Sequence, residues 1–199
     1  MHILDRSLSR LSKGLRTLVD WGLTITLAAA AVLIFQAEVA KPYRIPSPSM
    51  EPTLHCARPV SGCKARVADR VIANRLVYRF NAPRRGEIIV FKAPAQVEGA
   101  CGTEGTFIKR IVGLPGEKVS MRNGYVFIDG NRLDEPYMQG SYRGSESGEW
   151  VRIPSARYFV LGDNRTMSCD SRRWGVVPRN NIIGRAEVIY WPPNRIGEP

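Results

Sequence analysis

Two serines in a proline-rich stretch are the first side chains of this 199-residue sequence that could do chemistry. Ser47 and Ser49 lie within PSPSMEPTL, where Pro46, Pro48 and Pro52 surround them. Each proline fixes its own φ near about −65° and pushes the preceding residue toward extended geometry, so we expect a stiff, non-helical segment that displays both hydroxyls. A rigidly held hydroxyl suits a nucleophile. The alternative interpretation is a linker or turn, which proline and serine clusters often mark.

A lysine in a strand-like run is the candidate base. Lys109 and Arg110 follow Phe107 and Ile108, and strand alternation sends the lysine and the arginine to opposite faces, so one of the two must face inward. An apolar pocket disfavours the ammonium and lowers the lysine pKa below its ordinary value of about 10.4, which would make Lys109 a usable base at neutral pH. The alternative is a lysine that reaches solvent from an edge strand.

A polar turn, LGDNRTMSCDSRRWG, is the third feature. Its charged groups are costly to bury unless they pair with one another. Asp163, Asp170, Arg165 and Arg172 can form such pairs, which leaves Ser168 as a hydroxyl able to hold another donor. The alternative is a solvated turn with local side-chain to backbone hydrogen bonds.

The histidines and cysteines narrow the chemistry further. His55, six residues from Ser49, is the single candidate base for a Ser-His-Asp triad. Neither a C-x2-C nor an H-x3-H spacing occurs, so we expect no metal and no cofactor. The four cysteines are compatible with disulfides in an oxidising compartment, and free thiols are equally consistent with their spacing. Their pairing cannot be read from sequence, although Cys56 and Cys63 form the shortest loop to close.

An apolar run near the N-terminus, WGLTITLAAAAVLIFQA, is long enough to span a membrane. We therefore expect an N-terminal segment over residues 1–17, a single transmembrane anchor over 18–40 and a β-rich domain over 41–199. A cleavable signal peptide is the competing interpretation, but cleavage near the end of the run would leave the proline and serine stretch as a free N-terminus. Basic residues before the run favour a cytoplasmic N-terminus and an extracytoplasmic domain.

The composition points to an anionic neighbour. The formal net charge is +11. Anionic membrane lipid is the partner that we expect, because the arginines are scattered rather than clustered and the domain is predicted to lie outside. Nucleic acid is not expected as a partner.

The remainder of the chain has the pattern of an antiparallel β-fold. Strand-like runs alternate with turn formers, and Asn123-Gly124 and Asp129-Gly130 predict two tight hairpins. We expect mainly β structure with Greek-key-like connections, and surface loops near residues 94–106 and 137–150. The predicted strands cover residues 71–78, 87–92, 106–112, 118–122, 125–128, 157–161 and 182–191.

Three motifs in order, PSPSMEPTL, KRIVGLPG and GDNRTMSCDSRRWG, resemble those of type I signal peptidase, a membrane-bound Ser/Lys endopeptidase. The resemblance implies that Ser49 is the nucleophile and Lys109 its general base. It also implies that Ser168 orients the lysine and that the Ser47 hydroxyl contributes to the oxyanion hole. The ion pairs implied by the same motifs are Asp163 with Arg110 and Asp170 with Arg172. The implied substrate-pocket residues are Ile45, Met50, Leu54, Phe107 and Ile108.

The function implied by this resemblance is cleavage of signal peptides from exported precursors, after small residues in an Ala-X-Ala-like pattern, at the extracytoplasmic (periplasmic) side of the inner (plasma) membrane. Two alternatives remain open, a specialised pilin-processing or conjugation-type peptidase of the same Ser/Lys group and a non-catalytic, membrane-tethered basic binding domain. The sequence departs from the common family pattern at Pro48, Glu117 and Cys169, and in an insertion around Cys56 to Cys63.

Overall fold

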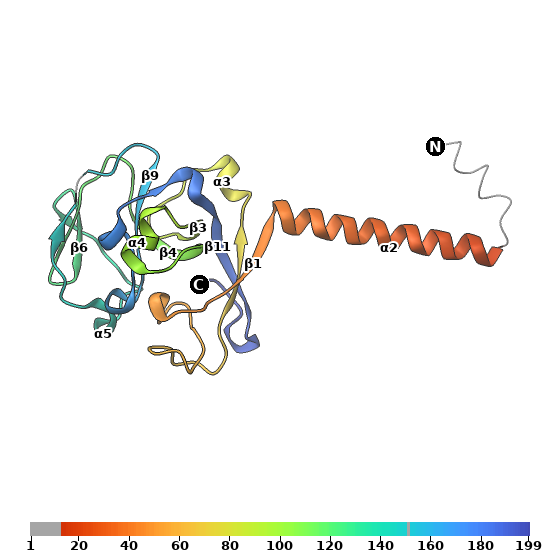
Figure 1. The fold of residues 1–199 in the computed structure, drawn as a ribbon, viewed down its shortest axis with the longest axis horizontal. Coiled ribbons are helices and arrows are strands. Elements are labelled where there is room, and N and C mark those ends of the chain that lie inside the picture. The colour runs from red at the N-terminus through yellow and green to blue at the C-terminus, as the bar shows by residue number, and fades with distance from the viewer. Residues whose placement is uncertain (1–12, 151) are drawn as a thin grey trace. The chain divides into compact units, whose positions relative to one another are not determined.

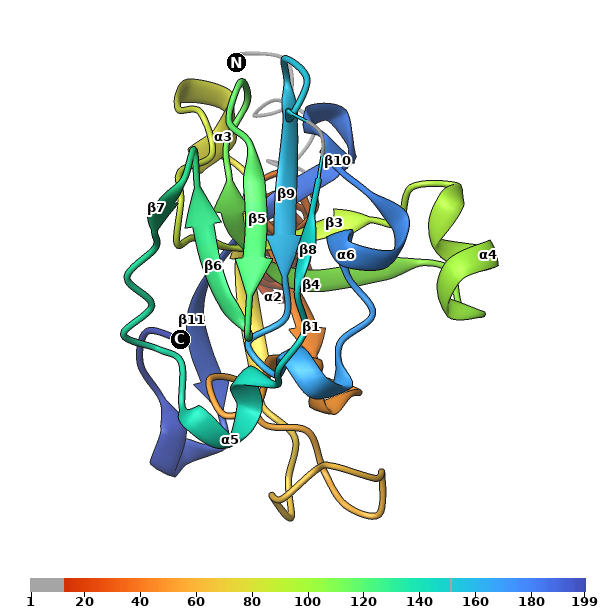
Figure 2. The ribbon, with the colours of Figure 1, turned by 90° about the vertical axis from the view of Figure 1, so that its left-hand side faces the viewer.

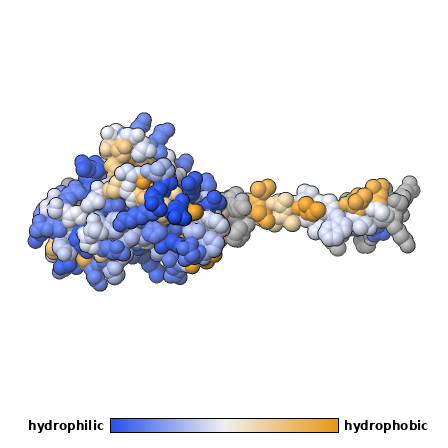
Figure 3. Space-filling model, turned by 90° about the horizontal axis from the view of Figure 1, so that it is seen from below, coloured by the Kyte–Doolittle hydropathy of each residue, from blue (hydrophilic) through white to orange (hydrophobic). Residues whose placement is uncertain are grey.

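The computed structural model describes residues 13–150 and 152–199, and the chain divides into two units, Met1–Val39 and Ala40–Pro199. The first unit contains a single described helix, α2 (Lys13–Glu38). Its stretch Gly14–Leu33 is long and apolar enough to cross a membrane, and apolar side chains recur along its surface (Figure 3). The predicted anchor over 18–40 thus falls mainly on a helix that begins five residues earlier. Most of the predicted 1–17 segment lies outside the described residues.

A seven-stranded sheet forms the larger part of the second unit (Figure 1). All neighbouring strands in it are antiparallel. The spatial order is β1 (Ala40–Arg44), β2 (Arg70–Asn74), β11 (Ile182–Trp191), β3 (Ile88–Lys92), β4 (Thr106–Gly113), β9 (Arg157–Leu161) and β10 (Val177–Pro178). The C-terminal strand β11 is inserted between β2 and β3, a connection between strands distant in sequence. The mainly antiparallel β-fold that the sequence predicts is confirmed.

A smaller four-stranded sheet packs beside β9 (Figure 2). Its order is β7 (Asn131–Arg132), β6 (Tyr125–Ile128), β5 (Val119–Arg122) and β8 (Gly148–Glu149). Asn123 and Gly124 have φ of 50° and 78°, and Asp129 and Gly130 have φ of 49° and 85°. Positive φ at both central residues is typical of the tight turns whose twist matches paired strands, so both predicted hairpins are confirmed.

Short helices connect these strands, and they correct two predictions. The strand predicted to continue through Tyr78 ends at Asn74, because the Asn74 side-chain oxygen accepts hydrogen bonds from the backbone N–H groups of Leu76 and Val77 and turns the chain into α3. The two predicted loops also contain regular elements: residues 94–106 include α4, and residues 137–150 include α5 and β8. The short helices are α3 (Val77–Phe80), α4 (Gln96–Cys101), α5 (Gly140–Arg143), α6 (Ser171–Trp174) and the 3-10 turns η1 (Pro48–Met50), η2 (Arg165–Met167), η3 (Arg179–Asn181) and η4 (Pro193–Arg195).

Three apolar clusters fill the second unit, and β4 contributes side chains to each of them. Ile111 belongs to the cluster formed with β3, β9 and α6. Ile108 packs against a second cluster, which contains residues of η1 and β2. Val112 belongs to a third cluster, which joins the small sheet to β9. Since both faces of β4 are covered, both polar side chains in its middle are buried. The sequence predicts that one of the two faces inward; in the structure both are buried, with Lys109 3% exposed and Arg110 8% exposed.

Candidate active site

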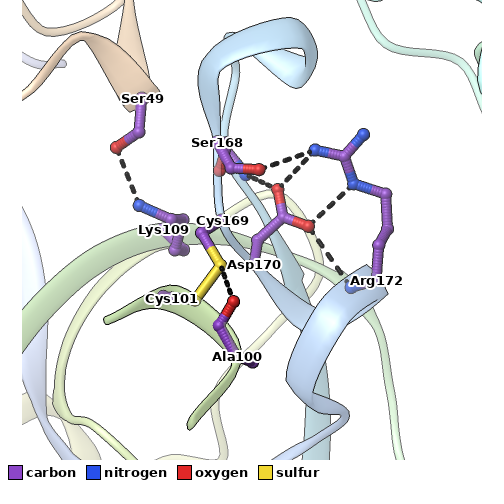
Figure 4. Close-up of a disulfide and its surroundings, with 9 residues drawn as sticks. Ser49, Ala100, Cys101, Lys109, Ser168, Cys169, Asp170 and Arg172 are labelled. Atoms are coloured by element: carbon purple, nitrogen blue, oxygen red, sulfur yellow. Dashed lines mark hydrogen bonds and ion pairs between the residues drawn. A yellow bond between two sulfur atoms is a disulfide. The ribbon is translucent and has the colours of Figure 1, made fainter. Parts of the chain in front are cut away.

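The two predicted catalytic side chains meet although 60 residues separate them in sequence. The Lys109 Nζ lies 2.7 Å from the Ser49 Oγ (Figure 4). It also donates a hydrogen bond of 3.0 Å to the carbonyl oxygen of Ile108. Ser49 is 5% exposed. At this distance a neutral amine can accept the hydroxyl proton directly.

Burial of the Lys109 side chain favours its neutral, deprotonated form. It lowers the pKa of Lys109 to about 8, from an ordinary value of 10.5. The carboxylates of Asp170 and Asp163 act in the opposite direction, and the Arg172 guanidinium acts in the same direction as burial. Desolvation wins because no carboxylate makes a direct ion pair with the ammonium among the described residues.

Ser49 lies on one turn of 3-10 helix rather than on the non-helical segment that the prolines predict. Pro48 is at the start of η1, where its fixed φ suits a helical turn and its missing N–H costs no hydrogen bond. The backbone N–H of Asn164 donates to the carbonyl oxygen of Ser49 over 3.1 Å, and the Thr53 hydroxyl donates to the Asp163 carboxylate over 2.6 Å. These contacts bind the nucleophile segment to the polar turn.

Gly162 explains how closely these two segments approach. A Cβ atom at this position would collide with the carbonyl oxygen of Ser49 and with the Ser168 Oγ, far inside van der Waals contact. The first residue of the GDNR sequence therefore has to lack a side chain.

Ser47 lies beside the nucleophile, at the exposed rim of the site. Its Oγ is 3.2 Å from the Ser49 Oγ. Because the hydroxyl is exposed and adjacent, it is free to point toward an oxygen bound at Ser49, as an oxyanion donor would.

Both predicted ion pairs are present. Arg110 forms a two-point contact with Asp163, at 2.9 and 2.7 Å, and Arg172 does the same with Asp170, at 2.8 and 2.9 Å. Arg165 does not pair with an aspartate of the turn. Its guanidinium instead contacts Glu135, a residue outside the turn. The Arg165 Nε donates to the carbonyl oxygen of Gly162 over 3.0 Å.

Figure 4 shows Ser168 on the polar turn next to Cys169, and the expected hydrogen bond from Ser168 to Lys109 is absent. Within the described part of the chain, the buried Ser168 Oγ has no hydrogen-bond partner at all. Its backbone oxygen accepts from Arg172 over 3.2 Å, which fixes the main chain there. The role of Ser168 therefore stays a prediction.

The single candidate histidine base is engaged elsewhere. The His55 Nδ1 lies 2.6 Å from a carboxylate oxygen of Glu51, which is fully buried, and the backbone N–H of His55 donates to Asp69. No group of three or more potential metal ligands occurs within residues 13–150 and 152–199. The cysteines form two disulfides, Cys56 with Cys63 and Cys101 with Cys169.

A cleft of about 370 Å³ opens beside the serine and lysine. Two of the five predicted pocket residues, Phe107 and Ile108, line it directly. Ile45, Met50 and Leu54 are buried in the apolar cluster that Ile108 packs against, so they lie beneath the wall rather than on it. The other lining residues are Pro46, Ser47, Ser49, Cys101, Thr103, Glu104, Thr106, Lys109, Met167 and Cys169.

Sequence reasoning missed the support behind Arg110. The guanidinium lies 4.0 Å from the centre of the Tyr137 ring, and the Tyr137 hydroxyl donates to Glu135 over 2.9 Å. Glu135 in turn pairs with Arg143 as well as with the arginine of the turn. These residues fall in a stretch with no recognisable motif, and the only sequence signal was an excess of arginines that needed partners.

Comparison with known proteins identifies the family of the chain. The family model described as "Signal peptidase, peptidase S26" matches residues 18–191. The chain is 43% identical over 193 residues to Signal peptidase I of Leptolyngbya laminosa, covering 96% of this chain and 84% of that protein. It is 33% identical over 227 residues to Signal peptidase I of Mycobacterium tuberculosis (strain ATCC 25618 / H37Rv), with 91% and 75% covered.

Two further similarities extend the range of relatives. The chain is 35% identical over 175 residues to Thylakoidal processing peptidase 1, chloroplastic, of Arabidopsis thaliana, covering 86% of this chain and 48% of that protein. A crystal structure of a signal peptidase I from Enterococcus faecalis V583 aligns with a TM-score of 0.44 at 29% identity, covering 53% of this chain and 97% of that one. With a family model matched over nearly the whole chain and relatives above 30% identity, the chain belongs to the Signal peptidase, peptidase S26 family.

Proposed function

We propose that this protein is a membrane-anchored serine endopeptidase that cleaves signal peptides from exported precursors after small residues, with Ser49 as nucleophile and Lys109 as general base. The observation that carries the proposal is the distance of 2.7 Å between a serine hydroxyl and a lysine amine that burial makes easy to deprotonate.

The catalytic cycle uses the groups in turn. Lys109 Nζ takes the proton of the Ser49 hydroxyl as Oγ attacks the scissile carbonyl, and the Ser47 hydroxyl with the backbone N–H of Ser49 stabilises the oxyanion. The C–N bond then breaks, and the protonated lysine gives its proton to the leaving amine. The neutral Lys109 amine then takes a proton from a water molecule, which attacks the acyl ester. The ester bond breaks, and the lysine returns the proton to the Ser49 Oγ.

The edge of β4 offers a place for an extended substrate. Over the described chain, β9 pairs with β4 only from Arg110 onward, so the Thr106–Lys109 half of β4 has strand β3 on one side and the cleft on the other. An extended peptide can add to such an edge through main-chain hydrogen bonds, with alternate side chains entering pockets. Phe107 and Ile108, which line the cleft, would bound a shallow apolar pocket beside the serine, which favours small residues before the cleaved bond.

The proposed membrane location is supported by α2 and by the disulfides of the second unit. A span of about 20 residues suits the Gly14–Leu33 stretch, and two disulfides fit an oxidising compartment on the extracytoplasmic side. We place the anchor in the inner (plasma) membrane, with anionic lipid near the basic second unit.

The test is cleavage of a synthetic precursor peptide with an Ala-X-Ala site by the full chain in detergent or lipid. Ser49→Ala and Lys109→Met should each abolish cleavage while the protein stays folded. The matched controls are Ser145→Ala and Lys118→Met, which remove the same groups at exposed positions and should leave the rate unchanged. Absence of cleavage by the wild type, or full activity of Ser49→Ala, would refute the enzymatic proposal and favour a non-catalytic binding domain.

A further inference from the structure

A disulfide forms part of the wall of the candidate active-site cleft. Cys101, the last residue of α4, is bonded to Cys169, and both line the cleft together with Ser49 and Lys109 (Figure 4). The bond joins positions 68 residues apart in sequence. It therefore ties the α4 region to the polar turn, on the side of the turn that faces the lysine.

The position of Cys169 within the turn gives the bond its importance. Cys169 lies between Ser168, whose buried hydroxyl has no partner within the described chain, and Asp170, whose carboxylate accepts from the backbone N–H of Gly162 over 3.0 Å. Asp170 is thus held by hydrogen bonds, whereas the Ser168 side chain is not. The restraints on where that hydroxyl lies are the Arg172 hydrogen bond to the Ser168 carbonyl oxygen and the covalent bond at the next residue, Cys169.

The disulfide also supplies apolar surface beside the amine. Phe107, Met167 and the two cysteines line the cleft in which Lys109 lies, and Lys109 itself is 3% exposed. Disulfide sulfurs carry no hydrogen and are weak acceptors, so this wall offers an ammonium almost no solvation. Cys101 and Cys169 also pack against the apolar cluster of β3, β4 and β9, which anchors the wall to the sheet.

We propose that the Cys101–Cys169 disulfide is a positioning element for catalysis, which holds the Ser168–Asp170 segment and the apolar cleft wall against Lys109. This inference rests on the proposed peptidase function. It predicts that the enzyme with this bond opened still folds but cleaves slowly, because the base is hydrated and misplaced.

The pH dependence distinguishes positioning from a general contribution to stability. The charged groups around Lys109 are Asp163 and Asp170 from the turn, which raise its pKa, and Arg172 from α6, which lowers it as burial does. Burial outweighs the two aspartates, and Glu104 lines the same cleft. Opening the wall admits water, so the lysine pKa moves up from about 8 toward its ordinary value of 10.5. The activity that is lost near neutral pH should therefore return in part as the pH rises.

The experiment measures kcat and KM for the precursor peptide from about pH 7 to about pH 10, with and without dithiothreitol, using the full chain. Two thiol–disulfide exchanges convert the bond into two cysteine thiols and the dithiol into its cyclic disulfide. We expect the reductant to lower kcat of the wild type roughly tenfold or more near neutral pH, with a smaller loss at high pH.

Variants assign the effect to one bond. Cys101→Ser with Cys169→Ser should show the lowered kcat and the shifted pH profile without reductant, and should not respond further to it. Cys56→Ser with Cys63→Ser removes the other disulfide and should keep the wild-type response to reductant.

Two results would overturn the inference while the peptidase function stands. One is wild-type kcat and pH profile in Cys101→Ser with Cys169→Ser. The other is a loss of activity that is uniform across pH and accompanied by a matching fall in the thermal unfolding temperature, which indicates a structural role only. A wild type that fails to cleave under oxidising conditions would instead refute the proposed function, and this inference with it.

Discussion

Replacing Lys109 by methionine should abolish catalysis and at the same time stabilise the folded protein near neutral pH. The side chain is 3% exposed and its pKa is about 8 in the folded protein, against 10.5 ordinarily. Below about pH 8 the amine is protonated in both states, and the folded protein carries the whole cost of burying the charge. Methionine has a similar length and no charge, so it fills the same space without that cost.

The magnitude follows from the two pKa values. Each pKa unit corresponds to about 1.36 kcal/mol, so the cost of the buried charge is roughly 3 kcal/mol at low pH. Loss of the hydrogen bonds to Ser49 and to the Ile108 carbonyl offsets about 1 kcal/mol of this gain. The unfolded state binds more protons than the folded state between about pH 8 and pH 10.5, so wild-type stability rises with pH through this window.

The assay is urea unfolding of the wild type and of Lys109→Met in the same detergent, at a series of pH values. Groups other than Lys109 titrate in both proteins, so their contributions cancel in the difference. The wild type should gain roughly 2–3 kcal/mol relative to the variant between about pH 7 and about pH 10. Two stability curves that run parallel across this range would show that the lysine titrates normally in the folded state, and the reasoning for a buried base would fail.

Three further substitutions test the geometry of the site. Ser47→Ala should lower kcat roughly 10²- to 10³-fold with little change in KM in steady-state kinetics, because an oxyanion donor acts mainly in the transition state; an unchanged kcat would remove Ser47 from the mechanism. Asp163→Ala leaves the Arg110 guanidinium, 8% exposed, without its partner, and should cost about 3–5 kcal/mol in urea unfolding. Gly162→Ala should lower both the unfolding temperature and the cleavage rate, because its Cβ would collide with the carbonyl oxygen of the nucleophilic serine. Gly140→Ala, where the added atom meets nothing within 4 Å, is the control, and equal effects of the two would contradict the argument.

Several features could be predicted from the sequence because they depend on local patterns. The two hairpins follow from Asn-Gly and Asp-Gly pairs, whose residues adopt positive φ at low cost. The strands follow from alternating and β-branched runs, and α2 follows from an apolar run of sufficient length. Ser49 and Lys109 could be paired from the sequence because three motifs occur in family order, and the distance of 2.7 Å between them agrees with that pairing. Their catalytic roles remain a prediction.

Other features depended on which distant segments meet. Arg165 contacts Glu135, 30 positions away in sequence, rather than an aspartate of its own turn. The sequence left the cysteine pairing open, because Cys101 and Cys169 are brought together only when α4 packs on α6. The end of the strand at Asn74 has a local cause instead. The Asn74 side-chain oxygen accepts hydrogen bonds from two backbone N–H groups, and the pattern of hydrophobic residues does not indicate this.

The sequence by itself therefore determined which groups are available for chemistry: a serine hydroxyl, a lysine amine and the side chains of a polar turn. It also determined that they belong to a β-rich domain that follows one apolar helix in the chain. Only the tertiary structure decided how much of that chemistry is accessible. Packing on both faces of β4 buries Lys109 and Arg110 together. The turn supplies the Asp163 carboxylate as a partner for the arginine, but no carboxylate of the turn contacts the lysine. Burial without a carboxylate in direct contact lowers the pKa of Lys109 to about 8, and this environment is set by long-range contacts.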